Sequence, residues 1–300
     1  MTNSTRDSDE TMPKSCVIPL HCSLGSGRQW ARLIEKLGNR CDAIAPDLAG
    51  YGDQKRPFYP LTTLAEEVQL LSDRLNGSTG PIHLVGHSYG AAVAFKIATG
   101  SPFASRVRSL ILIEPVLPTL LKDDAKDRRL HDRFADLARE TYGDLWNGLF
   151  MEALDKFCTF WNGSAPLQPI SPAARLRMIE QVDKLAFDFA AVLAEQDVAA
   201  AAARIRVPTL LFSGGLSPYL TQRIVARLAS IIPGAEVRHL RDAGHMMPCS
   251  HADLINPEII RHIRRADDLA ELSLVSGLGG PKTRRIDRNV QPSPAVGSAR

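Results

Sequence analysis

Short apolar runs alternate along the chain with segments in which apolar residues recur three and four positions apart. The short runs predict strands, and the periodic segments predict amphipathic helices. We expect strands at 16–21, 41–46, 82–87, 108–114, 209–214 and 236–240. We expect helices at about 27–38, 62–76, 89–99, 219–231 and 252–265. Because strands and helices alternate, the pattern predicts an α/β fold with a mostly parallel, doubly wound sheet of about six strands.

One connection breaks this alternation. About ninety residues separate the strand that ends at Glu114 from the next one, which is too long for a loop. Helical periodicity fills this segment, so residues 116–206 are predicted to form a helical cap inserted into a core of residues 15–115 and 207–266. The two ends, 1–14 and 267–300, lack periodicity or are rich in Gly, Pro, Ser and Arg, and they are predicted to be disordered.

Composition narrows the class of protein. The chain has 300 residues, of which 44% are hydrophobic and 23% charged, as is typical of a globular protein. Its formal net charge of +3 is small, and its basic residues are scattered apart from a cluster near the C-terminus, which argues against a nucleic-acid partner. Five widely spaced cysteines lack zinc or redox spacing and favour a reduced, cytoplasmic setting. No apolar run approaches the roughly 18 residues of a membrane span, no motif implies a cofactor or metal, and nothing indicates an oligomeric state.

The motif GHSYG, with Gly86, Ser88 and Gly90, follows a predicted strand and opens a helix of small residues. A strand-to-helix turn of this kind exposes a serine hydroxyl above the sheet edge, and glycines on either side avoid collisions with the neighbouring backbone. The helix that follows offers free N–H groups and a positive dipole end to a developing oxyanion. Ser88 is therefore the candidate nucleophile, although short motifs of this kind also occur by chance.

Two further loops belong to the same predicted sheet edge. LHCSLGSG, residues 20–27, follows the first strand, and the backbone N–H of Ser23 together with that of Tyr89 is the candidate oxyanion hole. His245, in the loop after the last strand, is the candidate general base. His21 and His87 are interpreted as loop-bracing and packing residues.

Together with APDLAGYG (45–52), these segments resemble those of α/β-hydrolases that carry a helical cap, in the same order and with similar separations. The resemblance covers about residues 16–265 and implies the α/β-hydrolase fold. Two antiparallel strands often open that fold, and they are expected to be missing here because only a short polar stretch precedes the first predicted strand.

The acid that orients the histidine is not at its usual place. Relatives commonly carry Gly-x-x-Asp after the strand at 209–214, but the third residue after Gly214 is Ser217. Glu114, which ends an apolar strand at the catalytic edge, is the predicted replacement, and certain haloalkane dehalogenases place their acid after this strand. The alternatives are a salt bridge between Glu114 and a cap arginine, a serine–histidine dyad, or another carboxylate. Asp47 and Asp242 are interpreted as loop-bracing residues.

A serine nucleophile argues against dehalogenase and epoxide hydrolase chemistry, which use an aspartate at this position. It favours an acyl-enzyme and hence hydrolysis of a carboxylic ester, thioester or lactone. The aromatic residues of the cap suggest a small hydrophobic substrate, with Trp146, Phe150 and Trp161 as candidate substrate-binding residues. Carbon–carbon bond hydrolysis, cofactor-free haloperoxidase-like chemistry and a non-catalytic ligand-binding protein remain alternatives.

Overall fold

The computed structural model describes residues 14–54, 61–163 and 170–278. Its sheet has six strands in the order β2-β1-β3-β4-β5-β6, and every pairing is parallel. The strands are β1 (Cys16–Leu20), β2 (Asp42–Ala43), β3 (Ile82–His87), β4 (Val107–Ile113), β5 (Thr209–Gly214) and β6 (Glu236–Leu240). The predicted α/β class and parallel sheet are confirmed, and the described sheet contains no antiparallel pair. The predicted disorder of residues 1–13 and 279–300 lies outside the described residues.

The second strand is much shorter than its prediction of 41–46. Its ladder with β1 pairs only Asp42 and Ala43. The Ile44 N–H still donates to Val17 O at 3.0 Å. Pro46 follows, and because proline has no N–H, it cannot continue a ladder. The apolar run therefore predicted a strand of the right direction but the wrong length, and the structure places this strand at one edge of the sheet.

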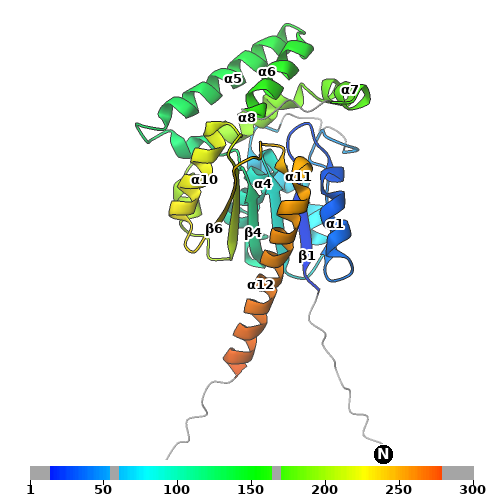
Figure 1. Ribbon diagram of the computed structural model, residues 1–300, viewed down its shortest axis with the longest axis vertical. Helices are drawn as coiled ribbons and strands as arrows, with labels where there is room; N and C mark the ends of the chain where they lie inside the picture. Colours follow the sequence, from blue (N-terminus) through cyan, green and yellow to red (C-terminus); the bar gives the residue numbers. More distant parts are fainter. Residues whose placement is uncertain (1–13, 55–60, 164–169, 279–300) are drawn as a thin grey trace, which may run out of the picture.

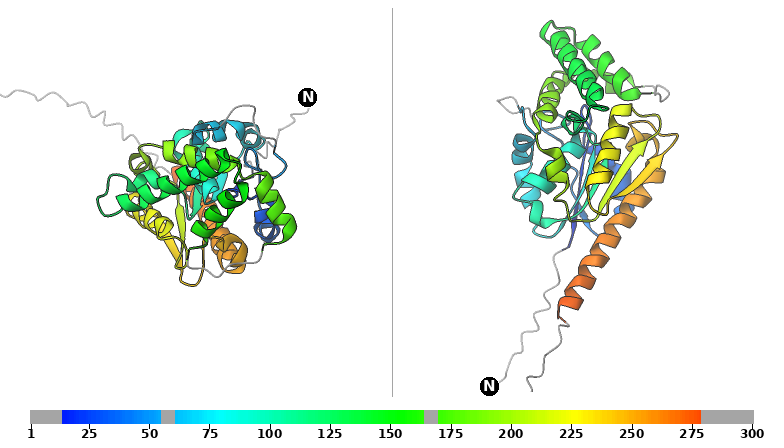
Figure 2. Two further views of the ribbon diagram at one scale, coloured as in Figure 1. Left: turned by 90° about the horizontal axis from the view of Figure 1, so that it is seen from above. Right: turned by 90° about the vertical axis from the view of Figure 1, so that its left-hand side faces the viewer.

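Helices cover both faces of the sheet (Figures 1 and 2). One face is packed by residues of α1 (Ala31–Leu37) and α12 (Ala252–Leu278), with η1 (Gly27–Trp30) and α11 (Met247–Ser250) beside them. The opposite face is packed by α2 (Leu64–Leu70), α3 (Ser72–Asn76), α4 (Tyr89–Gly100) and α10 (Tyr219–Ile231). A short turn, η2 (Ala104–Arg106), precedes β4. The strands β1, β3 and β4 are almost entirely buried between these layers.

The long connection between β4 and β5 forms a helical insertion. It consists of η3 (Pro118–Leu121), α5 (Arg128–Trp146), α6 (Phe150–Asn162), α7 (Pro172–Glu180), α8 (Lys184–Ala194) and α9 (Val198–Ala202). The hairpin of α5 and α6 lies at the end of the molecule beyond the carboxyl ends of the strands, with α8 between it and the sheet (Figure 1). Apolar residues of the insertion, including Phe134, Trp161 and Phe189, are continuous with the core around α4.

The prediction that disorder begins at residue 267 is wrong, because α12 continues to Leu278. The Asp267 carboxylate accepts hydrogen bonds from Arg108 Nη1 at 2.8 Å, His83 Nε2 at 3.2 Å and Ser15 Oγ at 3.3 Å. The segment ADDLAEL is rich in good helix formers, whereas the Gly- and Pro-rich composition starts about ten residues later. Within the described part of the chain, no helix is long and apolar enough to cross a bilayer.

Candidate active site

The turn between β3 and α4 holds Ser88 in a conformation that residues other than glycine rarely adopt, with φ 57° and ψ −119°. The glycines on either side explain how the turn closes. A Cβ on Gly86 would lie 2.4 Å from Ala91 Cα, and a Cβ on Gly90 would lie 2.3 Å from His21 O. The second approach also brings the start of α4 against the loop that contains Ser23. The Ser88 N–H donates to Ile113 O at 3.0 Å, which fixes the turn to β4.

His245 and Glu114 form a hydrogen-bonded series with this serine. Ser88 Oγ lies 2.9 Å from His245 Nε2, and His245 Nδ1 lies 2.6 Å from Glu114 Oε2. The other carboxylate oxygen, Glu114 Oε1, accepts the Gly214 N–H at 2.7 Å. Glu114 is fully buried and has a positive φ of 45°, so a second non-glycine residue is strained at this edge. Ser88 directly follows β3, Glu114 directly follows β4, and His245 lies in the loop after β6.

His87 has a role that the sequence did not reveal. Its Nε2–H donates to the backbone oxygen of His245 at 2.8 Å, and its Nδ1 accepts from Gln29 Nε2 at 3.2 Å. Burial, followed by the neighbouring His245, lowers the pKa of His87 well below its usual range. The neutral imidazole therefore anchors the histidine loop, whereas the sequence predicted only packing.

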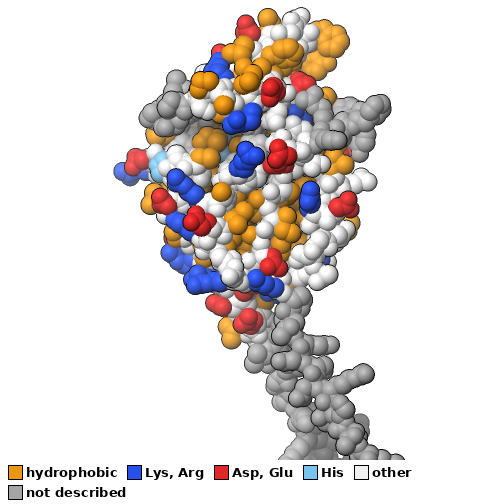
Figure 3. All heavy atoms as spheres, turned by 90° about the vertical axis from the view of Figure 1, so that its right-hand side faces the viewer, with side chains coloured by type: hydrophobic (Ala, Val, Ile, Leu, Met, Phe, Trp, Pro, Cys, Tyr) orange, Lys and Arg blue, Asp and Glu red, His pale blue; other side chains and the backbone are white. Residues whose placement is uncertain are grey.

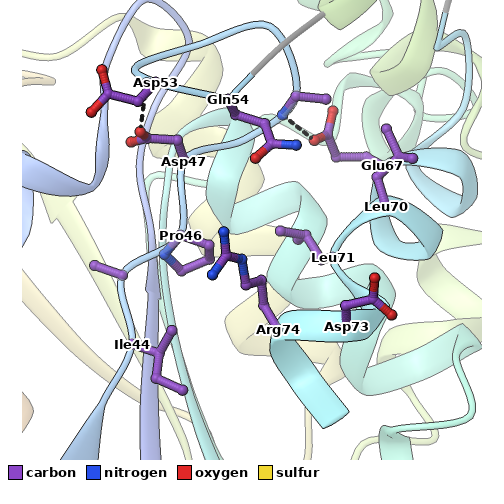
Figure 4. A pocket seen from close by; sticks show the side chains of 12 residues that line it. Ile44, Pro46, Asp47, Asp53, Gln54, Glu67, Leu70, Leu71, Asp73 and Arg74 are labelled. Atoms are coloured by element: carbon purple, nitrogen blue, oxygen red, sulfur yellow. Dashed lines mark hydrogen bonds between the residues drawn. The ribbon is translucent and has the colours of Figure 1, made fainter. Parts of the chain in front are cut away.

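The residues interpreted as loop-bracing lie around the loop after β1 that contains Ser23. His21 Nδ1–H donates to Cys22 O at 2.7 Å, and its Nε2 accepts the Leu48 N–H at 2.9 Å. Asp47 accepts the N–H groups of Gly27 at 2.7 Å and Asp53 at 2.8 Å, the latter visible in Figure 4. These contacts hold the segment after β1 against the segment after β2. Asp242 is exposed at the start of the histidine loop.

A small cavity of about 20 Å³ opens at Ser88. Ser23 and Tyr89 line it from the core, and Phe134, Phe157 and Trp161 line it from the insertion. The Trp161 ring stacks on His245, with ring centroids 4.4 Å apart and planes inclined by 22°. A volume of this size holds roughly one water molecule.

The other two predicted substrate-binding residues lie elsewhere. Trp146 is 79% exposed and Phe150 is 44% exposed, and neither is among the residues that line the cavity. They flank the turn between α5 and α6, where hydrophobic side chains gather at the outer end of the molecule (Figure 3). Helical periodicity showed that these helices are amphipathic, but it could not show which aromatic residue faces the nucleophile. Only Trp161 of the three is brought to the site.

No metal site accompanies this arrangement in the described ranges, which contain no cluster of three or more His, Cys, Asp or Glu side chains with suitable geometry. Cys22 lies in the loop after β1, next to Ser23. Burial raises the pKa of its thiol, so the reactive thiolate is strongly disfavoured.

The buried histidines predict how stability depends on pH. Burial lowers the folded-state pKa of both His21 and His87, whereas both titrate near their ordinary value of 6.5 in the unfolded chain. The unfolded state therefore binds more protons as the pH falls below 6.5, and folding loses up to about 1.4 kcal/mol per pH unit for each histidine. We expect urea unfolding at pH 7.5 and 5.5 to show this loss. Between pH 7.5 and 5.5, the free energy of unfolding should fall less in the His87→Gln variant than in the wild type.

The matched control is His239→Gln, which removes an exposed histidine and leaves His21 and His87 in place. An equal loss of unfolding free energy in wild type and His87→Gln would contradict a neutral, buried His87.

Comparison with known proteins places this fold and site in a class. The family model described as the alpha/beta hydrolase family matches residues 20–258. The chain therefore belongs to the alpha/beta hydrolase family, and the match includes Ser88, Glu114 and His245.

Individual relatives are more distant. Lipase LipV of Mycobacterium tuberculosis is 35% identical over 102 residues, which cover 34% of this chain and only 37% of that protein's length. The structure of MenH from S. aureus aligns with a TM-score of 0.69 at 20% identity, covering 86% of this chain and 96% of that one. An esterase from Exiguobacterium antarcticum aligns with a TM-score of 0.65 at 18% identity, covering 85% and 93%. At these identities, the two structures establish the fold alone.

Proposed function

We propose that the protein hydrolyses carboxylic esters, thioesters or lactones of small hydrophobic substrates through an acyl-enzyme on Ser88. The observation that carries this proposal is the series from Ser88 Oγ through His245 to Glu114, at 2.9 and 2.6 Å. Such a series is the arrangement that activates a serine for acyl transfer. The aromatic wall of the adjoining cavity supports an apolar substrate.

The proposed mechanism has two proton-balanced halves. His245 Nε2 takes the Ser88 proton while Oγ attacks the carbonyl carbon, and the protonated imidazole then gives that proton to the departing alcohol or thiol. In the second half, His245 takes a proton from water, the hydroxide attacks the acyl-enzyme, and the proton returns to Ser88 Oγ as the acid leaves. Glu114 accepts the Nδ1–H throughout, which fixes the tautomer and stabilises the imidazolium.

The backbone N–H groups of Ser23 and Tyr89 are the proposed oxyanion donors. Tyr89 is the first residue of α4, so its N–H has no acceptor within the helix. Ser23 lines the same cavity as Ser88 and Tyr89. Two such donors, aimed where charge develops, contribute a few kcal/mol each to the transition state.

The test is covalent labelling followed by a substrate series. The native protein is treated with a fluorophosphonate, and the adduct is located by peptide mass spectrometry, with heat-unfolded protein as the control. We expect a single adduct on Ser88 of the native protein only. A series of p-nitrophenyl esters with acyl chains of increasing length then measures the apolar preference. Absence of an adduct, or hydrolysis of none of the esters by the untreated protein, would contradict the proposal.

A further inference from the structure

A buried cluster of three charged side chains lies beside the cavity and takes no part in the mechanism above. Lys184 Nζ, on α8 of the insertion, lies 2.5 Å from Asp188 Oδ1 and 3.3 Å from Glu67 Oε2 on α2. All three residues are at least nine-tenths buried. We call these three residues the lysine–carboxylate cluster. The cluster joins the insertion to the core.

Each carboxylate of the cluster holds the side chain of one proposed oxyanion donor. Ser23 Oγ donates to Asp188 Oδ2 at 2.5 Å, and Tyr89 OH donates to Glu67 Oε2 at 3.2 Å. Lys184 is thus the common partner of two carboxylates, one of which binds Ser23 and the other Tyr89. Both of these residues line the cavity at Ser88.

Further contacts restrict the carboxylates to these positions. Asp188 Oδ2 also accepts the Tyr51 hydroxyl at 2.6 Å. Glu67 Oε1 accepts the Ala49 N–H at 2.8 Å, which is the hydrogen bond drawn as a dashed line at Glu67 in Figure 4. Lys184 Nζ lies 5.0 Å from the centroid of the Tyr89 ring, within the range of a cation–π contact. The cluster is therefore satisfied on every side, which is the condition for a buried polar network to hold one geometry.

Stability alone does not account for such a cluster. Two carboxylates and one ammonium group carry a net charge of −1 when all are ionised, and removing them from water is expensive. A net negative charge also opposes an oxyanion, so a favourable electrostatic field is not the benefit to the reaction. What the cluster supplies is position. It holds Ser23 and Tyr89 relative to each other across the gap between the loop after β1 and the start of α4.

We propose that Lys184, acting through Asp188 and Glu67, is the positioning residue of the oxyanion hole, and that docking of α8 is what completes this hole. This inference rests on the function proposed for Ser88. It assigns to the insertion a part in the chemical step, in addition to the aromatic wall that it contributes to the cavity.

The test removes each tether while leaving the backbone donors and all three charges in place. Ser23→Ala removes only the hydroxyl that Asp188 holds, and Tyr89→Phe removes only the one that Glu67 holds. We expect kcat for a p-nitrophenyl ester to fall between about tenfold and a hundredfold in each variant, less than the loss of a whole donor, with KM nearly unchanged. The control is Ser230→Ala, which removes an exposed hydroxyl that donates to Arg227 O within α10, outside the proposed site, and should retain the kcat of the wild type.

A transition-state analogue separates positioning from a structural role. An alkylboronic acid forms a tetrahedral adduct with a serine, so its affinity should weaken in Ser23→Ala and Tyr89→Phe by the same factor as kcat/KM. Affinity for the product acid should stay constant. Because the two tethers meet at Lys184, their combined effect should differ from the product of the single effects.

Lys184→Met removes the common partner and should lower kcat at least as much as either tether variant. If this variant does not fold, Ser23→Ala and Tyr89→Phe decide the question. Unchanged kcat and boronate affinity in both would overturn the inference, whether or not their melting temperatures fall. A wild-type protein that is neither labelled by fluorophosphonate nor active on esters would instead overturn the proposed function, so the two failures are distinguishable.

Discussion

Replacing Ser88 by alanine is expected to lower kcat for ester hydrolysis by about a millionfold, as when the nucleophile of a comparable triad is removed. In the proposed mechanism the Ser88 hydroxyl is the attacking group, and it lies 2.9 Å from His245 Nε2. The other serine that lines the cavity, Ser23, donates its hydroxyl to Asp188 instead. The variant keeps the strained turn, because alanine accepts the same φ no better and no worse than serine. The residual rate should reflect binding and the oxyanion donors alone.

The measurement compares wild type, Ser88→Ala and Ser109→Ala on the same p-nitrophenyl ester. Ser109 is also fully buried, but its hydroxyl bonds to His83 Nδ1 at 2.8 Å on the neighbouring strand, outside the proposed site. Ser109→Ala should therefore lose stability and keep its turnover. Equal turnover in Ser88→Ala and wild type would refute the acyl-enzyme on Ser88, whereas absence of turnover in the wild type would favour a protein that binds ligands without converting them.

The sequence predicted those parts of the site that depend on local structure. GHSYG predicts the turn at Ser88 because the strand, the two glycines and the helix are contiguous, and the close approaches at Gly86 and Gly90 follow from that continuity. Glu114 and His245 are 131 residues apart, and their hydrogen bond was predicted only because parallel strands end at one edge of the sheet.

Contacts made by the insertion were not predictable in the same way. Periodicity identifies which residues share a helix face, but it does not show which face meets the core, so Trp146 and Trp161 were equivalent candidates. The lysine–carboxylate cluster was missed because Lys184 and Glu67 are 117 residues apart. A signal was nevertheless present, since Lys184 and Asp188 stand four residues apart in the otherwise apolar helix KLAFDFAAVLA. Charged residues on an apolar helix are buried only when they are paired.

Replacing Glu114 by glutamine is expected to lower kcat by about ten-thousand-fold with the fold intact. Gly214 N–H donates to Glu114 Oε1 at 2.7 Å, so the oxygen of the glutamine amide should stay on that side. Its NH₂ group then faces His245 Nδ1, which must accept rather than donate. The proton is thereby held on Nε2, and the imidazole can no longer take the proton of Ser88.

Glu195→Gln is the matched control for this substitution. Glu195 is also a buried glutamate, but it pairs with Lys96 Nζ at 2.9 Å outside the proposed site. Both kcat and the rate of fluorophosphonate labelling should fall in Glu114→Gln, and neither should change in Glu195→Gln. Wild-type turnover in Glu114→Gln would instead show that the histidine works as a dyad or with another carboxylate.

A second substitution in the Glu114→Gln background tests whether Glu114 replaces the acid that relatives commonly carry after β5. Ser217 stands at that usual position, is buried, and its Oγ has no hydrogen-bond partner among the described residues. This hydroxyl also lies next to Gly214, the residue that holds Glu114, at 2.7 Å from where a Cβ on Gly214 would be. We expect Ser217→Asp to restore part of the activity lost in Glu114→Gln, because it returns a carboxylate to the position at which relatives commonly carry their acid. If Ser217→Asp raises the activity of Glu114→Gln but does not raise that of the wild type, either carboxylate can serve as the single acceptor for the Nδ1–H of His245. No gain of activity in the Glu114→Gln background would contradict this expectation.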